Sequence, residues 1–400
     1  MRATLALCAV LAASCATTFD ASSPDGAVKA SNRFGFDLYA RVKQDRGNVI
    51  CSPISASIAL TMTAAGAGGK TLAQISNVLH LDPGRLPESH ASFASLLTAL
   101  NQREAEPAGL QLRVADRLWG QKDVSFKREF LSLLEDRYRA PLAEVDFVHA
   151  TEAARDAINR WAAERTHDRI PQIIPPGALD RDSRLVLTNA VYFKGAWFYP
   201  FEPSATADLP FSTPAGPRVA RMMARTADVR HTAVRGAALV ELPYKGGLSM
   251  VVILPDAVDG LDEVESRVAA SYPEWIAALR PKRVDLQLPR WKVSSDLPLK
   301  ETLAAMGMPA AFEVGADFGG IADIKPLYVY NVLQQAFIDV DEEGTEAAAV
   351  TAVEMVGVAE QVEPELERVV FHANRPFMYV IRDVETGAVL FVGRVVEVGG

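Results

Sequence analysis

The six histidines are the side chains best suited to bind a metal ion or to transfer a proton near neutral pH. They are scattered along the chain, at His80, His90, His149, His167, His231 and His372. No two have metal-ligand spacing, and no His-Glu-x-x-His motif occurs. A Gly-x-Ser-x-Gly motif, which exposes a serine nucleophile on a sharp turn, is also absent. We therefore expect a protein that is not an enzyme and that uses no metal or cofactor.

The segment Gly66–Thr71 (GAGGKT) resembles the end of a phosphate-binding loop. The full motif requires a glycine five residues before Gly69, and Ala64 stands there. The motif also requires a preceding strand, whereas the residues before Gly66 have a helical pattern. We expect these glycines to end one helix before the next begins.

The three cysteines, Cys8, Cys15 and Cys51, are too few for a disulfide framework. Cys51 follows Val49 and Ile50, and this apolar setting favours buried packing over reactivity.

Residues 1–15 (MRATLALCAVLAASC) have the pattern of a targeting segment. Arg2 precedes an apolar run that is too short to span a bilayer. Ala12–Cys15 resembles a bacterial lipoprotein cleavage box, in which the cysteine becomes lipidated; an ordinary secretory signal is the alternative. Residues 16–26 then form a flexible tether. The expected location is extracytoplasmic: either the bacterial cell envelope, through a lipid on Cys15, or the medium.

The composition excludes some partners. The 400 residues are 49% hydrophobic, with a mean hydropathy of +0.07, which is ample for a large core. The net charge is −9 and the pI is about 5.3. This balance argues against general binding to nucleic acid or to anionic membranes.

The segment 341–354 (DEEGTEAAAVTAVE) combines an acidic start, one glycine and a run of small residues. As a strand, it would place Thr345, Ala347, Ala349 and Thr351 on one face, so that it could slide between two existing strands. Gly344 would be the pivot. The alternative is an alanine-rich helix, which the segment taken alone favours slightly.

Helical patterns dominate the first half of the chain and strand patterns the second. Helices are expected at 27–44, after Ser52-Pro53, and at 72–79, 88–101, 126–138, 151–165, 264–279 and 299–306. Strands are expected at 110–119, 184–193, 239–242, 248–254, 284–288, 327–340, 377–382 and 389–395. The run 184–193 is apolar throughout, as in a strand buried on both faces. No linker divides the mature chain, which predicts one α+β domain over 27–400 with mostly antiparallel strands.

Several blocks in fixed order resemble the serpin family over almost all of the chain after residue 27. They are Asn48–Ser55, Asn189–Trp197 followed by Pro200-Phe201, Leu242–Gly246, Val251–Asp256, Leu288–Trp291, Met306–Phe312, Asp317–Ile321, Arg375–Phe377 and Phe391–Arg394. Any one block is weak evidence, and together they make a strong match.

The resemblance implies a serpin fold with three β-sheets, eight or nine helices and an exposed reactive-centre loop at about 342–368. In this family a serine protease cleaves the loop and becomes covalently trapped when the loop inserts into the central sheet. The hinge would be Glu342, Glu343, Gly344, Thr345, Glu346, Ala347, Ala348, Ala349 and Val350. The protein would act as a monomeric suicide inhibitor. The alternatives are a non-inhibitory binding or chaperone-like member and an inhibitor of cysteine proteases.

The usual family spacing from Glu342 places the reactive bond between Val358 and Ala359, and the long loop leaves Met355 and Val356 as alternatives. A small aliphatic residue before the cut favours elastase-like or subtilisin-like proteases. The acidic run 360–368 would steer a basic protease or would simply be solvated.

The resemblance also implies a sheet-opening cluster of Ser52, Ser55, Asn189, Gln334 and Trp197. Many relatives carry a histidine where this chain has Gln334, which cannot become a cation. We expect Gln334 to hydrogen-bond within this cluster without titrating. No helix has a basic face, so activation by a heparin-like polyanion is not expected.

Overall fold

The computed structural model describes residues 23–43, 47–104, 111–345 and 366–398. Within these ranges the chain forms eight α-helices and two sheets. The helices are α1 (Asp25–Val42), α2 (Pro53–Ala64), α3 (Gly69–Val78), α4 (Leu86–Glu104), α5 (Arg128–Tyr138), α6 (Thr151–Arg165), α7 (Leu261–Ala278) and α8 (Lys300–Met306). The predicted α+β class is confirmed, and α2 and α3 are separated at the glycines as expected.

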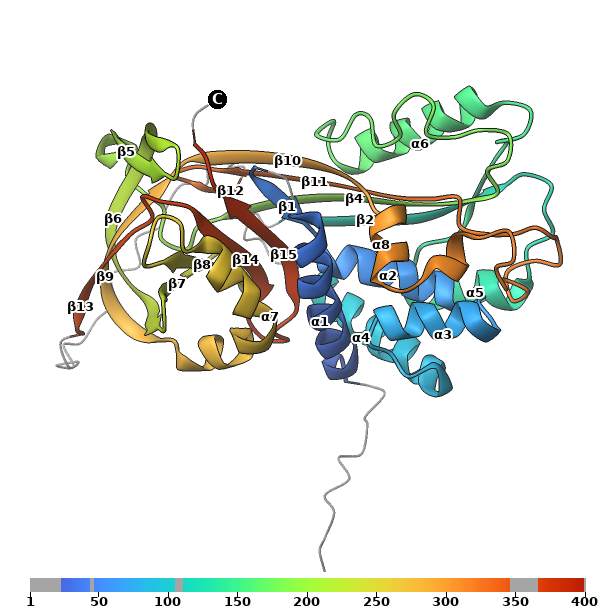
Figure 1. Cartoon of the computed structure of the whole chain (residues 1–400), viewed down its shortest axis with the longest axis horizontal. Coiled ribbons are helices and arrows are strands. Elements are labelled where there is room, and N and C mark those ends of the chain that lie inside the picture. Colours follow the sequence, from blue (N-terminus) through green and yellow to red (C-terminus); the bar gives the residue numbers. More distant parts are fainter. Residues whose placement is uncertain (1–22, 44–46, 105–110, 346–365, 399–400) are drawn as a thin grey trace, which may run out of the picture.

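The six-stranded sheet lies between two helical layers. Its order is β10 (Trp291–Pro298), β11 (Asn331–Val340), β12 (Gly344–Thr345), β4 (Leu185–Ala196), β2 (Gln111–Gln121) and β3 (Ala143–Val145). Helix α6 covers one face, while α2 and the other N-terminal helices lie against the opposite face (Figure 1). Strand β4 is buried along nearly all its length because helices cover both its faces, as its apolar run predicts.

The second sheet contains nine strands. Its path is β1 (Val49–Cys51), β15 (Val389–Val395), β14 (Phe377–Asp383), β8 (Leu248–Pro255), β7 (Ala237–Pro243), β6 (Gly216–Val234), β9 (Arg280–Pro289) and β13 (Arg368–His372), with β5 (Ala207–Thr213) paired to β6. The family resemblance implies three sheets, and the described residues form two. The reason is the long strand β6, which pairs with β7 at one end and with β5 and β9 along the rest.

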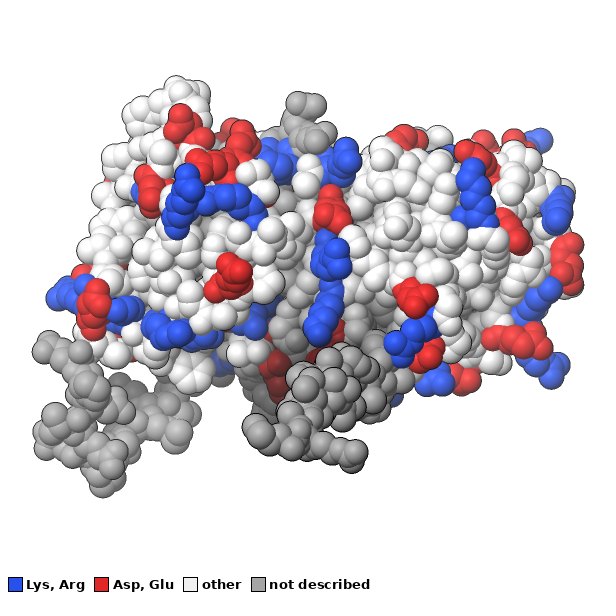
Figure 2. Space-filling view, turned by 60° about the horizontal axis from the view of Figure 1, so that its bottom comes forward, with Lys and Arg blue, Asp and Glu red and all other residues white. Residues whose placement is uncertain are grey.

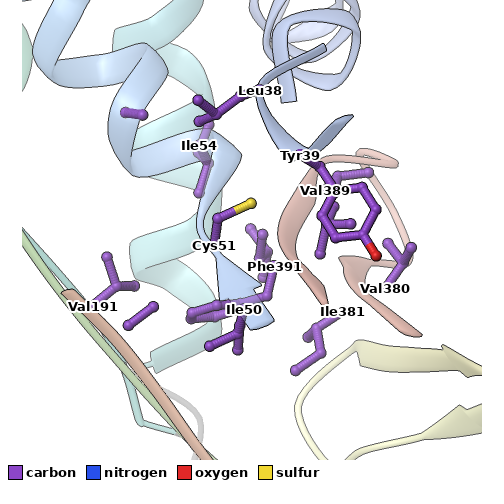
Figure 3. Packing of buried hydrophobic residues seen from close by; sticks show 14 of the residues in the cluster. Leu38, Tyr39, Ile50, Cys51, Ile54, Val191, Val380, Ile381, Val389 and Phe391 are labelled. Atoms are coloured by element: carbon purple, nitrogen blue, oxygen red, sulfur yellow. The ribbon is translucent and has the colours of Figure 1, made fainter. Parts of the chain in front are cut away.

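The main hydrophobic core lies where α1 and α2 meet strands from both sheets. Cys51 is fully buried there beside Ile50, Ile54 and Phe391 (Figure 3). Burial raises the pKa of its thiol to about 12, so the thiolate is not available for chemistry at neutral pH. The expected packing role of Cys51 is confirmed.

In the described part of the chain, no helix is long and apolar enough to cross a membrane. The same residues contain no group of three or more histidine, cysteine, aspartate or glutamate side chains placed to hold a metal ion.

Candidate functional site in the six-stranded sheet

The centre of the six-stranded sheet contains a parallel pair, although the sequence pattern predicted mostly antiparallel strands. Strands β4 and β11 pair from Val186 with Asn331 to Tyr192 with Phe337. Their other long pairings, β2 with β4 and β10 with β11, are antiparallel. Parallel pairs are slightly less stable per residue than antiparallel ones. This pair is therefore the weakest long seam of the sheet.

The short strand β12 already lies in this seam. Beyond Tyr192 and Phe337, Thr345 pairs with Val340 of β11 and with Gly195 of β4, antiparallel to both. Strand β12 runs from the ends of its two neighbours back toward their middle. A longer strand in the same direction would separate β4 from β11 and pair with each of them.

Gly344 allows this close approach. Its φ of 156° lies in a region that other residues rarely adopt. A Cβ atom there would stand 2.1 Å from the carbonyl oxygen of Gly195. The next residue, Thr345, is fully buried, and its Oγ1 lies 2.7 Å from the hydroxyl of Tyr244. Glycine followed by a small residue is thus what the geometry requires, and the helical alternative is wrong for these two positions.

Glu342 anchors the turn that precedes β12. Its carboxylate is buried and accepts hydrogen bonds from Arg290 Nε at 2.9 Å and from the hydroxyl of Thr206. Arg290 Nη2 lies 2.5 Å from its other oxygen. Burial opposes ionisation, but the hydrogen bonds from Arg290 and Thr206 outweigh it and hold the pKa of Glu342 below its usual value.

The chain after β4 binds the carbonyl groups of the same turn. The indole Nε1 of Trp197 donates to the carbonyl oxygen of Asp341 at 3.0 Å, and the backbone N–H of Trp197 donates to that of Glu343 at 2.9 Å. The N–H of Phe201 donates to the carbonyl oxygen of Glu342 at 2.8 Å. Trp197 is itself held by stacking on Tyr244, with ring centroids 4.3 Å apart.

A polar row crosses the middle of the sheet. Asn189 of β4 stands in register with Asp116 of β2 on one side and with Gln334 of β11 on the other. The first turn of α2 lies over this row. The backbone N–H of Ser52 donates to Gln334 Oε1 at 2.9 Å, and Gln334 Nε2 donates to the carbonyl oxygen of Ser52 at 3.0 Å. Gln334 thus makes the hydrogen bond expected of it, with the backbone of Ser52.

The rest of the expected cluster is arranged differently. Ser55 and Asn189 do not bond to Gln334: both donate to Oδ1 of Asp116, Asn189 at a distance of 2.9 Å. Trp197 does not join the row, because it follows Asn189 by eight residues on an extended strand, roughly 25 Å. Trp197 instead contacts the start of the hinge, through its hydrogen bonds to Asp341 and Glu343. Sequence reasoning missed Asp116, although a charged residue inside the alternating run LQLRVADRLW was a usable signal.

Several predicted residues lie outside the described residues. They are Cys15, the later hinge positions Glu346, Ala347, Ala348, Ala349 and Val350, and the cleavage candidates Met355, Val356, Val358 and Ala359. The roles proposed for them stay predictions.

Comparison with known proteins gives a consistent result. Residues 29–398 match the family described as serpin (serine protease inhibitor). The chain is 37% identical over 377 residues to the leukocyte elastase inhibitor of Xenopus tropicalis, covering 91% of this chain and 97% of that protein. It is 36% identical over 388 residues to human serpin B3, covering 92% and 98%. The crystal structure of Serpin48 from Tenebrio molitor superposes with a TM-score of 0.81 at 29% identity, covering 94% of this chain and 99% of that one.

Proposed function

The chain belongs to the serpin family, and from this membership we infer that it inhibits serine proteases as a suicide substrate. The observation that carries this inference is strand β12, which already lies between β4 and β11. It supplies the first residues of an inserted strand. The side chains that would follow it into the seam are small, because 347–349 are all alanine.

Insertion has enough driving force to trap a protease. It replaces the parallel ladder of β4 and β11 with two antiparallel ladders, and each added hydrogen bond contributes a net stabilisation of about 0.5–1.5 kcal/mol. About ten such bonds approach the whole stability of a domain, roughly 5–15 kcal/mol. The uncleaved protein is therefore metastable relative to the inserted form.

The protease supplies the nucleophile and the general acid that cleave the loop. The protease serine attacks the carbonyl carbon of the residue before the cut, which we propose is Val358. The bond to the nitrogen of Ala359 breaks, and the new amino group leaves with a proton from the protease general acid. The ester that remains links the protease to the loop. Insertion then drags the protease along the sheet and distorts its active site before water can hydrolyse the ester.

Val358→Arg is expected to redirect inhibition. The wild-type protein should form a complex that survives a denaturing gel with an elastase-like protease and none with trypsin. The variant should reverse this preference by at least about 100-fold in association rate, because the specificity pocket of a trypsin-like protease requires a cation. The same substitution at Met355 or Val356 is the matched control.

The variant that redirects inhibition identifies the reactive bond. If Met355→Arg or Val356→Arg redirects inhibition and Val358→Arg does not, the reactive bond lies earlier in the loop. Complete cleavage of every variant without a covalent complex would contradict inhibition and indicate a non-inhibitory serpin.

We also propose that the protein is held at the bacterial cell envelope by a lipid on Cys15, with residues 16–26 as the tether. The support is the sequence alone, through Arg2, the short apolar run and Ala12–Cys15. The relatives named above are animal proteins and do not support it. Labelled palmitate should be incorporated by the wild-type protein and not by Cys15→Ser. If neither protein incorporates the label, the lipid anchor is wrong and the alternative of an ordinary secretory signal is favoured.

We further propose that the inhibitor is a monomer and needs no polyanion. On the face shown in Figure 2, lysine and arginine side chains are mixed with aspartate and glutamate side chains over most of the surface, and basic side chains follow one another only in a short row at the lower left. Such a mixed surface attracts an extended anionic polymer weakly.

A further inference from the structure

Asp116 is a carboxyl group in the polar row that the mechanism above leaves unused. Its Oδ1 accepts two hydrogen bonds, from Ser55 and Asn189. Its Oδ2 is shielded from solvent and has no hydrogen-bond partner among the described residues, and the same holds for Oδ1 of Asn189. Both of these atoms are acceptors. The row is therefore short of one donor, which a proton on Asp116 would supply.

The start of α2, with Ser52 as its N-cap, ties the two halves of the sheet together through this row. On one side, the backbone of Ser52 is bound to Gln334 of β11. On the other, the hydroxyl of Ser55 is bound to Asp116 of β2, which is paired with β4. An inserted strand parts β4 from β11, so at least one of these attachments must break or slide.

We propose that Asp116 is a positioning residue for sheet opening and that its protonated form holds the closed sheet on α2. This inference deepens the proposed function and rests on it. With the proton in place, the row gains its missing donor and carries no charge. Without it, a carboxylate with one unpartnered oxygen is held away from water, and opening the sheet relieves that cost.

The surroundings decide the direction of the pH effect. Asp116 lines a cavity of about 250 Å³ beside β2, whose other charged or titratable lining groups are Arg117 of β2, Tyr138 and Arg139 at the end of α5, and Arg165 of α6. Helix α4 contributes only Leu97, Leu100 and Asn101 to the same wall, and the groups that touch Asp116 from α2 and β4 do not titrate.

Burial raises the pKa of Asp116 to about 7, against the hydrogen bonds from Ser55 and Asn189, which favour the carboxylate. Because this pKa is above the ordinary value of about 3.9, the proton stabilises the closed sheet at low pH. That stabilisation declines as the pH rises and is lost above about pH 7.

A peptide of the hinge sequence, residues 345–353 with blocked ends, tests this without a protease. It should enter the seam of the uncleaved full chain and raise its melting temperature. Its only carboxyl side chain, from Glu346, stays ionised between pH 6 and pH 8. The rate of insertion into the wild-type protein should rise about tenfold over this range, following the fraction of Asp116 that is deprotonated.

Asp116→Asn keeps the shape, removes the charge and supplies a permanent donor. Its insertion rate should be flat with pH, at about the rate of the wild-type protein at pH 6. The matched control is Asp123→Asn, an exposed aspartate just past β2, which should keep the wild-type profile. A pH profile of Asp116→Asn equal to that of the wild-type protein would overturn the proposal.

If Asp116→Asn does not fold, the wild-type protein alone can test the proposal. In wild-type protein with carbon-13-labelled aspartates, one carboxyl group should titrate near pH 7, and its pKa should fall in the complex with the peptide. A flat wild-type insertion profile overturns the inference. If peptide insertion does not depend on pH but protease complexes form normally, the role of Asp116 is wrong and the proposed function stands. If insertion depends on pH but no protease complex forms, the proposed function is wrong and the role of Asp116 in sheet opening stands.

Discussion

Replacing Thr345 by arginine should convert the protein from an inhibitor into a substrate. Thr345 is fully buried between Val340 and Gly195, and its hydroxyl meets Tyr244. The described residues that line this position, Val340, Gly195 and Tyr244, offer no carboxylate partner for a guanidinium, and burying it there costs several kcal/mol. The cation should therefore keep β12 out of the seam in the uncleaved protein, and insertion after cleavage must then bury it. Each 1.4 kcal/mol that this burial adds to the insertion barrier slows insertion about tenfold, so hydrolysis of the ester should overtake trapping.

The fraction of protease in covalent complex on a denaturing gel should fall below roughly a tenth of the wild-type value. Cleavage within 355–360 should raise the melting temperature of the wild-type protein by roughly 10 °C or more and leave that of Thr345→Arg nearly unchanged. Glu343→Arg is the control, because Glu343 is exposed and contacts its neighbours through backbone groups. Equal complex formation by Thr345→Arg and the wild-type protein would contradict insertion as the trapping step.

Features coded locally could be predicted from the sequence. The apolar run 184–193 indicated a strand covered on both faces, and β4 is such a strand. The glycine followed by small residues indicated a pivot, but the segment taken alone slightly favoured a helix, and the family resemblance was needed to favour a strand; β12 begins at Gly344. In β4 and at the glycine pivot the residues that carry the signal are adjacent, so both features can be recognised without knowing which strands pair.

Features that depend on register could not be predicted. Asp116 and Asn189 are separated by 73 residues, and Arg290 and Glu342 by 52. Asp116 and Asn189 stand opposite each other in β2 and β4, and Arg290 and Glu342 lie just beyond the paired residues Trp291 and Val340. The sequence alone does not specify either register. The same reason explains the placement of Trp197, which the motif put near Asn189 and the extended geometry of β4 moves to the hinge.

Glu342→Lys is expected to be the most damaging change in the described part of the hinge. Glu342 is buried, and its two carboxylate oxygens receive Arg290 and the hydroxyl of Thr206. Lysine would place a second cation beside Arg290 with no counter-ion. Breaking a fully buried ion pair costs about 3–5 kcal/mol. Because the side chain of Arg290 is 43% exposed, solvent screens part of the repulsion, and the loss here should be smaller than that.

The loss should release the hinge and leave the seam open at one end. Strand β12 would leave its place between β4 and β11, and their backbone groups would become free to pair with a strand from another molecule. We therefore expect a lower melting temperature and chains of linked molecules on mild warming, seen by size-exclusion chromatography with light scattering. Glu343→Lys makes the same charge change at an exposed neighbour and should stay monomeric.

A charge exchange separates the ion pair from other effects of the substitution. Adding Arg290→Glu to Glu342→Lys restores opposite charges at the same two positions and should recover most of the lost stability. The wild-type pair should also weaken in acid: the pKa of Glu342 is held low, so its contribution is present at neutral pH and is lost as the pH falls through that value. Glu342→Gln should lack this acid-dependent loss. If Glu342→Lys melts at the same temperature as Glu343→Lys and remains monomeric, the anchor is not what keeps the seam closed.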